Sequence, residues 1–136
     1  MNVNIDSKLR PLYANLLRLS IDKYLISKRF NYLCIEYNID QLWGRCEEYI
    51  WNLRRANMVI PVYTDYAEEA LGVFLTELFR KDQSLFISVL SKIIIDFADW
   101  DRETKDFSKV IESLFNLGYT EDDLEEILAR MKKREN

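Results

Sequence analysis

The sequence predicts an all-α protein, folded as a single-domain bundle of six or seven helices. Three glycines and two prolines among 136 residues leave few positions for turns. Apolar residues recur at the three- and four-residue spacing of a buried helix face along most of the chain. A chain of this length can bury about 70% of its unfolded surface. We therefore expect residues 1–136 to form one domain without a metal or a disulfide.

The first helix is expected from Ser7, or the residue after it, to about Ser27. Asp6 or Ser7 is a suitable N-cap, and Pro11 is tolerated because it falls near the helix start. Residues 28–38 are apolar and aromatic on nearly every side. They predict a short central helix, and their β-branched and aromatic content leaves a strand as the alternative.

The next helix is better marked, because Asp40 is a good N-cap and helical spacing continues to about Ala56. Gly44 inside this helix costs about 1 kcal/mol relative to alanine, and it indicates either a close helix–helix contact or a weak point. Residues 58–63 are expected to form a short extended segment, because the residue before Pro61 avoids the α region. This segment is either a crossover connection or a short strand.

Two further helices are expected after this segment. Asp65 is the expected N-cap of a fourth helix, and Glu68 lies three residues later at the capping-box position. Asp82 or Ser84 is expected to start a fifth helix. Its run of isoleucines over residues 93–95 indicates a central position that is covered on most sides.

The last part of the chain predicts a sixth helix over residues 104–117 and a seventh helix after it. Gly118 stands where a helix C-terminus commonly needs a left-handed residue. Thr120 is the expected N-cap of the seventh helix, and Tyr119 and Leu124 are placed to form a hydrophobic staple around it.

The absence of histidine removes the commonest general base and the commonest transition-metal ligand. Neither common glycine-rich phosphate-binding motif is present. We therefore expect a protein that is not an enzyme and needs no cofactor. Cys34 and Cys46 lie among apolar neighbours and are expected to be buried free thiols. No apolar stretch reaches the length of a transmembrane helix and no secretory signal is evident, so we expect a cytoplasmic protein without a membrane partner.

Two pairs of carboxylates leave one catalytic alternative, a Mg²⁺-dependent helical phosphohydrolase. Asp96 with Asp99, and Glu103 with Asp106, are three residues apart, and oxygen ligands of this kind hold Mg²⁺. The competing interpretation is a solvated acidic corner in which Asp99, Asp101 and Glu103 stabilise the start of the sixth helix. We favour this second interpretation, because it needs no bound ion.

Charge is divided unevenly along the chain. Residues 1–62 carry nine basic and six acidic residues, a net charge of +3. Residues 63–136 carry ten basic and seventeen acidic residues, a net charge of −7. This asymmetry either steers a charged partner to one side of the molecule or lets the two halves of the chain attract each other.

Nucleic-acid binding is an alternative function. The helix over residues 41–56 carries Arg45, Arg54 and Arg55, and an extended segment is expected after it. Such a segment also follows the recognition helix of a winged helix-turn-helix. DNA- and RNA-binding proteins usually carry more positive charge than this chain, whose net charge is −4.

The function that we expect is recognition of another protein, as an adaptor, an assembly subunit or an inhibitor or immunity-type protein. Tyrosine, tryptophan and arginine dominate the energetics of interfaces, and aromatic residues are dense between residues 30 and 66. Trp51 lies about 80° around its helix from Trp43, at the edge of the core stripe. An acidic C-terminal surface suits a basic partner. The expected partner-binding residues are Trp51, Arg54, Arg55, Tyr63, Tyr66, Asp99, Trp100, Asp101 and Glu103.

Overall fold

The computed structural model describes residues 4–56, 63–101, 103 and 105–135. Within these ranges the chain forms one 3-10 turn and eight α-helices and contains no strand, which confirms the predicted all-α class. The elements are η1 (Ser7–Leu9), α1 (Arg10–Arg18), α2 (Ile21–Leu25), α3 (Lys28–Glu36), α4 (Asp40–Ala56), α5 (Tyr63–Lys81), α6 (Gln83–Trp100), α7 (Ser108–Asn116) and α8 (Glu125–Glu135). Most of the predicted extended segment, residues 58–62, lies outside the described residues, and Tyr63 begins α5.

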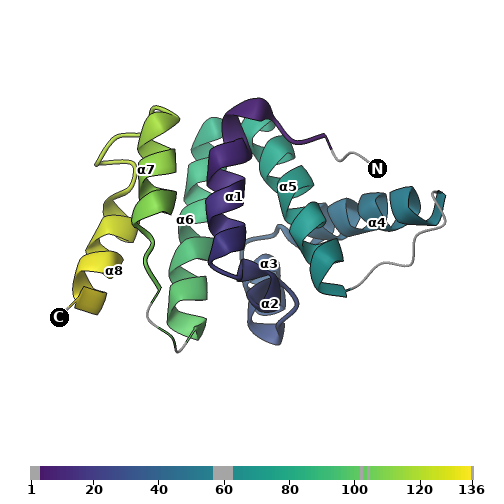
Figure 1. Cartoon of the computed structure of the whole chain (residues 1–136), viewed down its shortest axis with the longest axis horizontal. Helices are drawn as coiled ribbons and strands as arrows, with labels where there is room; N and C mark the ends of the chain where they lie inside the picture. Colours follow the sequence, from purple (N-terminus) through teal and green to yellow (C-terminus); the bar gives the residue numbers. More distant parts are fainter. Residues whose placement is uncertain (1–3, 57–62, 102, 104, 136) are drawn as a thin grey trace.

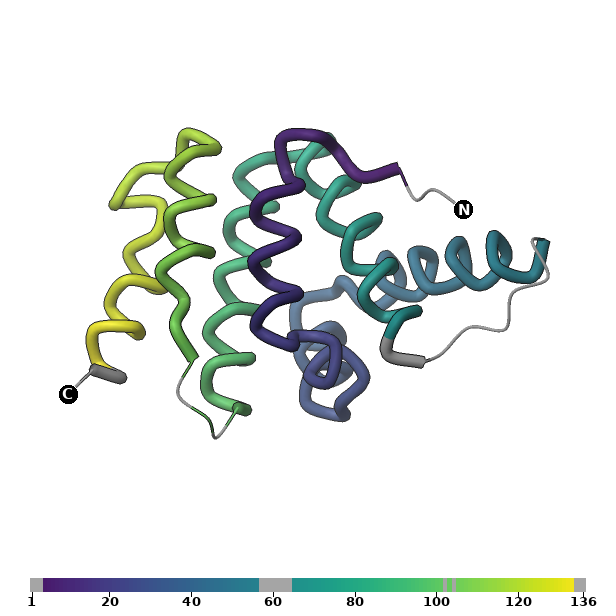
Figure 2. The backbone as a smooth tube through the Cα atoms, viewed as in Figure 1, coloured from purple at the N-terminus to yellow at the C-terminus, as the bar shows by residue number. Residues whose placement is uncertain are grey.

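The helices form a layered bundle that is longest from α8 to α4 (Figure 1). α1 packs against α7, and α5 packs against both α4 and α6. α8 covers another side of α6, and the short helices α2 and α3 lie at the end of the bundle where α1 finishes. α2 contacts α5 and α6, and α3 contacts α4 and α6. The backbone trace in Figure 2 shows α4 and α8 at opposite ends of the molecule.

The predicted first helix is divided, which corrects the expectation of one helix up to Ser27. The backbone of Ser20 is left-handed, with φ 61°, and its N–H bonds to the carbonyl of Leu17. The chain therefore turns between α1 and α2, and the turn buries Ile21, Tyr24 and Leu25. Burial of these three side chains offsets the cost of a left-handed serine, about 1–2 kcal/mol.

Residues 28–36 form α3, so the helix expected there is confirmed and the strand alternative is wrong. α3 ends in a Schellman turn at Asn38, whose φ is 58°. The N–H of Ile39 donates to the carbonyl of Cys34 at 2.8 Å, and both side chains are buried. α4 starts directly afterwards, with Asp40 as its first residue and not as its N-cap.

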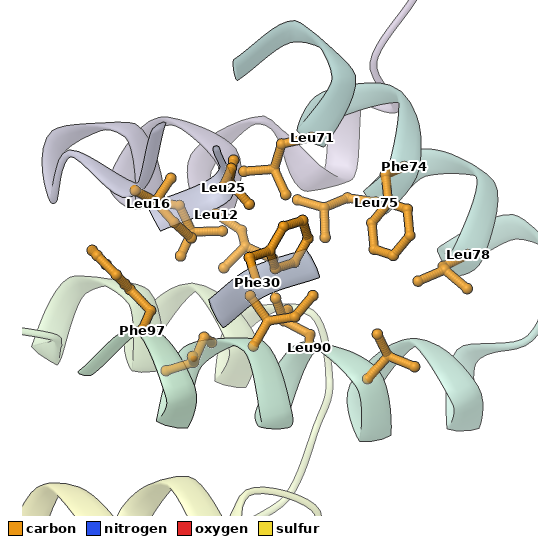
Figure 3. Packing of buried hydrophobic residues seen from close by; sticks show 14 of the residues in the cluster. Leu12, Leu16, Leu25, Phe30, Leu71, Phe74, Leu75, Leu78, Leu90 and Phe97 are labelled. Atoms are coloured by element: carbon orange, nitrogen blue, oxygen red, sulfur yellow. The ribbon is translucent and has the colours of Figure 1, made fainter. Parts of the chain in front are cut away.

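α6 lies at the centre of the core. Asp82 caps it as expected, because its carboxylate accepts hydrogen bonds from the N–H groups of Ser84 and Leu85. Figure 3 shows Leu90 and Phe97 of α6 facing side chains from the other helices across the core. Eight α6 residues are buried: Phe86, Val89, Leu90, Ser91, Ile93, Ile94, Phe97 and Ala98. No described helix is long and apolar enough to cross a membrane.

Hydrogen bonds mark the ends of the last two helices. α7 begins at Ser108, later than expected, with Phe107 at its N-cap position. Just before it, the carboxylate of Asp106 accepts from the Ser108 N–H at 2.9 Å. Gly118 adopts φ 102°, as predicted for a left-handed helix end. Thr120 and Asp123 form the reciprocal bonds of a capping box, but α8 begins at Glu125, so Thr120 is not the N-cap that was predicted.

α5 starts before its predicted cap. Tyr63 is the first residue of α5, so Asp65 lies in the first helical turn and is not the N-cap. The carboxylate of Asp65 still lies where the positive end of the helix dipole favours a negative charge.

We predict that Gly44→Ala stabilises the protein by about 1 kcal/mol, because glycine costs about that much in a helix interior. Gly44 is exposed, and a Cβ built on it meets no atom within 4 Å. This open space excludes the close helix–helix contact that was one interpretation of Gly44. Urea unfolding at constant m-value measures the change in the free energy of unfolding.

Gly72→Ala is the matched control on α5. A Cβ at Gly72 would lie 2.7 Å from the Cδ1 atom of Ile5 and 3.3 Å from Cε1 of Tyr13. The Ile5 side chain must therefore shift, and this substitution should be less favourable than Gly44→Ala by about 1 kcal/mol. An equal gain for both glycines would contradict the packing of Ile5 on α5.

Candidate partner-binding surface

The structure separates the predicted partner-binding residues into two groups. Trp51, Arg54, Arg55 and Tyr66 lie on α4 and α5, whereas Asp99, Trp100, Asp101 and Glu103 lie at and after the C-terminal end of α6. The C-terminal ends of α4 and α6 are far apart in Figure 1. Tyr63 is on α5, but its side chain lies outside the described part of the structure.

In the first group, Trp51 is 43% exposed, at the edge of the buried stripe as its helical position predicts. Its ring stands edge-on to Tyr66 at 6.1 Å, and the Tyr66 hydroxyl donates to the carbonyl of Glu47. Arg54 is an internal residue, because its side chain is only 12% exposed and pairs with Glu69. Trp51 and Arg55 are therefore the exposed members of this group, and Arg54 joins α4 to α5.

In the second group, the acidic side chains are already paired. Asp99 of α6 binds Arg130 of α8. Asp101 binds Lys105 at 3.3 Å and accepts from the N–H of Glu103 at 2.9 Å. These contacts correct the expectation that Asp99, Asp101 and Glu103 stabilise the start of the sixth helix, because α7 begins only at Ser108 and its first N–H bonds to the carboxylate of Asp106.

Trp100 also has a packing role. Its ring centroid lies 5.7 Å from that of the fully buried Tyr24, and the indole is half-buried against the core. Trp100 therefore stabilises the contact between α2 and α6.

Asp96 anchors α6 to two other helices. Its carboxylate accepts the hydroxyl of buried Tyr24 at 2.6 Å and the Nε–H of Arg29 at 2.8 Å. Burial and the bond to Asp96 raise the pKa of Tyr24. Asp96 and Asp99 thus have separate cationic partners, and the described residues contain no group of three or more potential metal ligands. The geometry gives the Mg²⁺ interpretation no support.

The exposed face of α3 was not among the predicted binding residues. Phe30, Leu33 and Cys34 of this helix are buried, but Tyr32 is 66% exposed and Ile35 is 54% exposed. Tyr32 and Ile35 are three residues apart, so they are neighbours on one helix face. The sequence did contain a signal for this exposure, because residues 28–38 are apolar on nearly every side of the helix. When neighbouring helices cover only one side of such a helix, apolar residues on the other side remain exposed.

A hollow of about 380 Å³ lies between α3 and α6. Tyr32, Leu33 and Tyr37 line its α3 side, and Ile95 lines its α6 side. Glu36 of α3 lies at the same hollow and forms no ion pair among the residues that the structure describes. The hollow therefore combines aromatic walls with an exposed carboxylate.

A second hollow of about 250 Å³ lies between α6 and α8, on the other side of Lys92. Lys92 borders both hollows and binds Glu126 at 2.9 Å, which raises the pKa of the Lys92 ammonium. We call the lining of the two hollows, together with Ile35, the α3–α6–α8 surface.

The α3–α6–α8 surface is acidic. Its basic side chains are Arg29 and Lys92. Its acidic side chains are Glu36, Asp96, Asp99 and the four carboxylates of residues 122, 123, 125 and 126. Two positive and seven negative charges give −5, or −4 when Arg130, the partner of Asp99, is included.

A scan against protein-family models, a search of curated proteins and a search of solved structures each found no match to this chain.

We predict that removing one partner of the Arg54–Glu69 pair lowers the free energy of unfolding more than replacing both partners with apolar side chains. Nε of Arg54 and Oε2 of Glu69 are buried without a hydrogen-bond partner. Glu69→Ala leaves the guanidinium of Arg54 in a mostly buried site and should destabilise the fold by about 2 kcal/mol. The double variant Arg54→Met/Glu69→Leu should lose less, because apolar side chains suit that site. Urea unfolding measures the free energy of unfolding of both variants. A double variant that loses more stability than Glu69→Ala would contradict the internal role of Arg54.

The two cysteines are buried, as expected, and burial raises the pKa of each thiol to about 12. At pH 8 about one thiol in ten thousand is then a thiolate, the reactive form. We predict that iodoacetamide alkylates Cys34 and Cys46 at least about a hundredfold more slowly in the native protein than in urea. Mass spectrometry follows the labelling. Fast native labelling would show that either thiol is accessible.

Proposed function

We propose that this chain is a non-catalytic protein-interaction module. Its partner is a protein with a basic segment that also carries apolar side chains, and the binding site is the α3–α6–α8 surface. The observation that carries the proposal is the exposure of Tyr32 and Ile35 beside a surface with a net charge of −5.

The α3 end of the surface supplies apolar contact area. Tyr32 and Ile35 stand side by side, and Tyr37, 39% exposed, borders the same hollow. Neighbouring exposed apolar side chains of this size are common at binding sites, and tyrosine is among the residues that dominate interface energetics. A tyrosine ring next to a carboxylate such as Glu36 also suits a partner's arginine, which can contact both.

The α8 end of the surface supplies charge. Asp122 and Glu125 are exposed, and neither forms an ion pair among the described residues. Charges of one sign that lie together raise the rate of encounter with a partner of opposite charge. This end of the surface therefore selects for basic segments, and the α3 end adds affinity.

Polar contacts between helices hold the parts of the surface together. Asp96 ties α6 to α2 through Tyr24 and to α3 through Arg29, and Lys92 ties α6 to α8 through Glu126. A preorganised surface loses less conformational entropy on binding. These ion pairs therefore support the proposed site by fixing its three helices relative to one another.

Nucleic-acid binding through the helix over residues 41–56 is not supported by the geometry. Arg54 is paired inside the protein, which leaves Arg45 and Arg55 as the exposed arginines of α4. Neutralising several phosphates requires more cations than these two.

We predict that Tyr32→Ala/Ile35→Ala weakens partner binding about 30-fold, because two neighbouring apolar anchors are lost. The test is affinity capture from the native host with the wild-type chain, this double variant and Tyr49→Ala. Tyr49 is 46% exposed on α4 and is the matched control. A basic protein should be captured by the wild type and by Tyr49→Ala, should be lost with the double variant, and should elute at raised salt.

Two results would count against the proposal. One is equal capture of the same protein by the wild type and the double variant. The other is retention of duplex DNA at low salt with no protein partner. Circular dichroism should show that the double variant keeps the wild-type helix content, because both substituted side chains are exposed in the folded chain.

A further inference from the structure

We infer that a second groove, formed by α4, α5 and the start of α6, binds an acidic peptide segment that carries leucine-like side chains. This inference rests on residues that the α3–α6–α8 surface does not include, so the two proposals can fail separately. The groove has a volume of about 570 Å³, which makes it larger than either hollow of that surface.

The floor of the groove is apolar. Ile39 and Leu78 are buried beneath it, Leu42 is half-buried, and Leu85 is 41% exposed at its edge. Leu85 is in the first turn of α6, where an exposed leucine contributes little to the core. An amphipathic segment that inserts one or two apolar side chains would cover Leu42 and Leu85.

The rim of the groove is basic. Arg45 of α4 and Arg80 and Lys81 of α5 line it, against one carboxylate, Glu77. Three positive charges and one negative charge give +2, or +1 when Asp6, which binds Arg80 at 3.1 Å, is included. The whole chain has a net charge of −4, so this groove differs in sign from the molecule around it.

Arg45 and Lys81 are the two rim cations whose charge is available to a ligand. Neither forms an ion pair among the described residues, whereas Arg80 is engaged with Asp6. Lys81 also complements the dipole at the C-terminal end of α5. Arg45 is exposed in the middle of α4 and has no such role, so its charge is available to a ligand.

An acidic peptide fits these features better than a nucleic acid does. A phosphate backbone needs a row of cations, and Glu77 would repel it inside the groove. The apolar floor would gain nothing from a phosphate, whereas carboxylates that flank a leucine would reach the rim while the leucine contacts the floor. Charge complementarity therefore identifies the occupant as a peptide with acidic and apolar side chains.

The test uses two fluorescein-labelled amphipathic peptides with leucines at helical spacing, one with glutamates at the polar positions and one with lysines. Fluorescence anisotropy should show preferential binding of the glutamate peptide to the wild-type chain. Arg45→Glu/Lys81→Glu should weaken that binding about tenfold, because two attractive charges become repulsive. Arg55→Glu, an exposed arginine of α4 outside the groove, should change it little. Amide chemical-shift changes should centre on Leu42 and Leu85.

Three results would overturn the inference. The first is equal or tighter binding of the lysine peptide. The second is binding of single-stranded RNA or duplex DNA, in place of the glutamate peptide, with dependence on Arg45 and Lys81. The third is loss of glutamate-peptide binding in Tyr32→Ala/Ile35→Ala with no effect of Arg45→Glu/Lys81→Glu, which would place the acidic ligand on the other surface.

Discussion

The rest of the structure depends on the burial of α6. This helix is apolar on most sides, so it needs cover from several directions, and α2, α3, α5 and α8 all contact it. One stripe of α6 stays polar, through Ser88, Lys92, Asp96 and Asp99, and each of these residues is about one turn from the next on the same face. α3 and α8 flank that stripe. The candidate site therefore lies along the polar side of α6, which does not need to be buried.

To enclose α6, the N-terminal part of the chain must reverse direction within a short length. Local sequence patterns predicted the helices and several of their ends, but not this reversal. The all-α class, the cap at Asp82 and the left-handed Gly118 follow from local patterns and are confirmed. The break at Ser20 could not be predicted in this way, because serine has no intrinsic preference for left-handed backbone. The buried contacts of α2 with α5 and α6 stabilise that conformation, and they join residues far apart in sequence.

The candidate site was harder to predict for the same reason. Arg29 and Asp96 are 67 positions apart and Asp99 and Arg130 are 31 apart, so no local pattern shows that these charges neutralise each other. The expected acidic corner therefore included carboxylates that are already paired. For Tyr32 the error was in the other direction: a short apolar helix was expected to be covered on all sides, so an exposed side chain was taken as buried. Trp51 was placed correctly because its position depends only on the helical period of α4.

The pairs Arg29–Asp96 and Arg54–Glu69 join the basic half of the chain to the acidic half, so part of the charge asymmetry holds the fold together. The available charge is segregated, with carboxylates along α8 and cations around Leu85 at the start of α6. Leu85 and Asp99 are fourteen residues apart on α6, about 21 Å at the rise of an α-helix. A basic partner on the α3–α6–α8 surface and an acidic segment in the groove would thus both contact α6. The opposite charges of the two proposed sites would favour a different ligand at each of them.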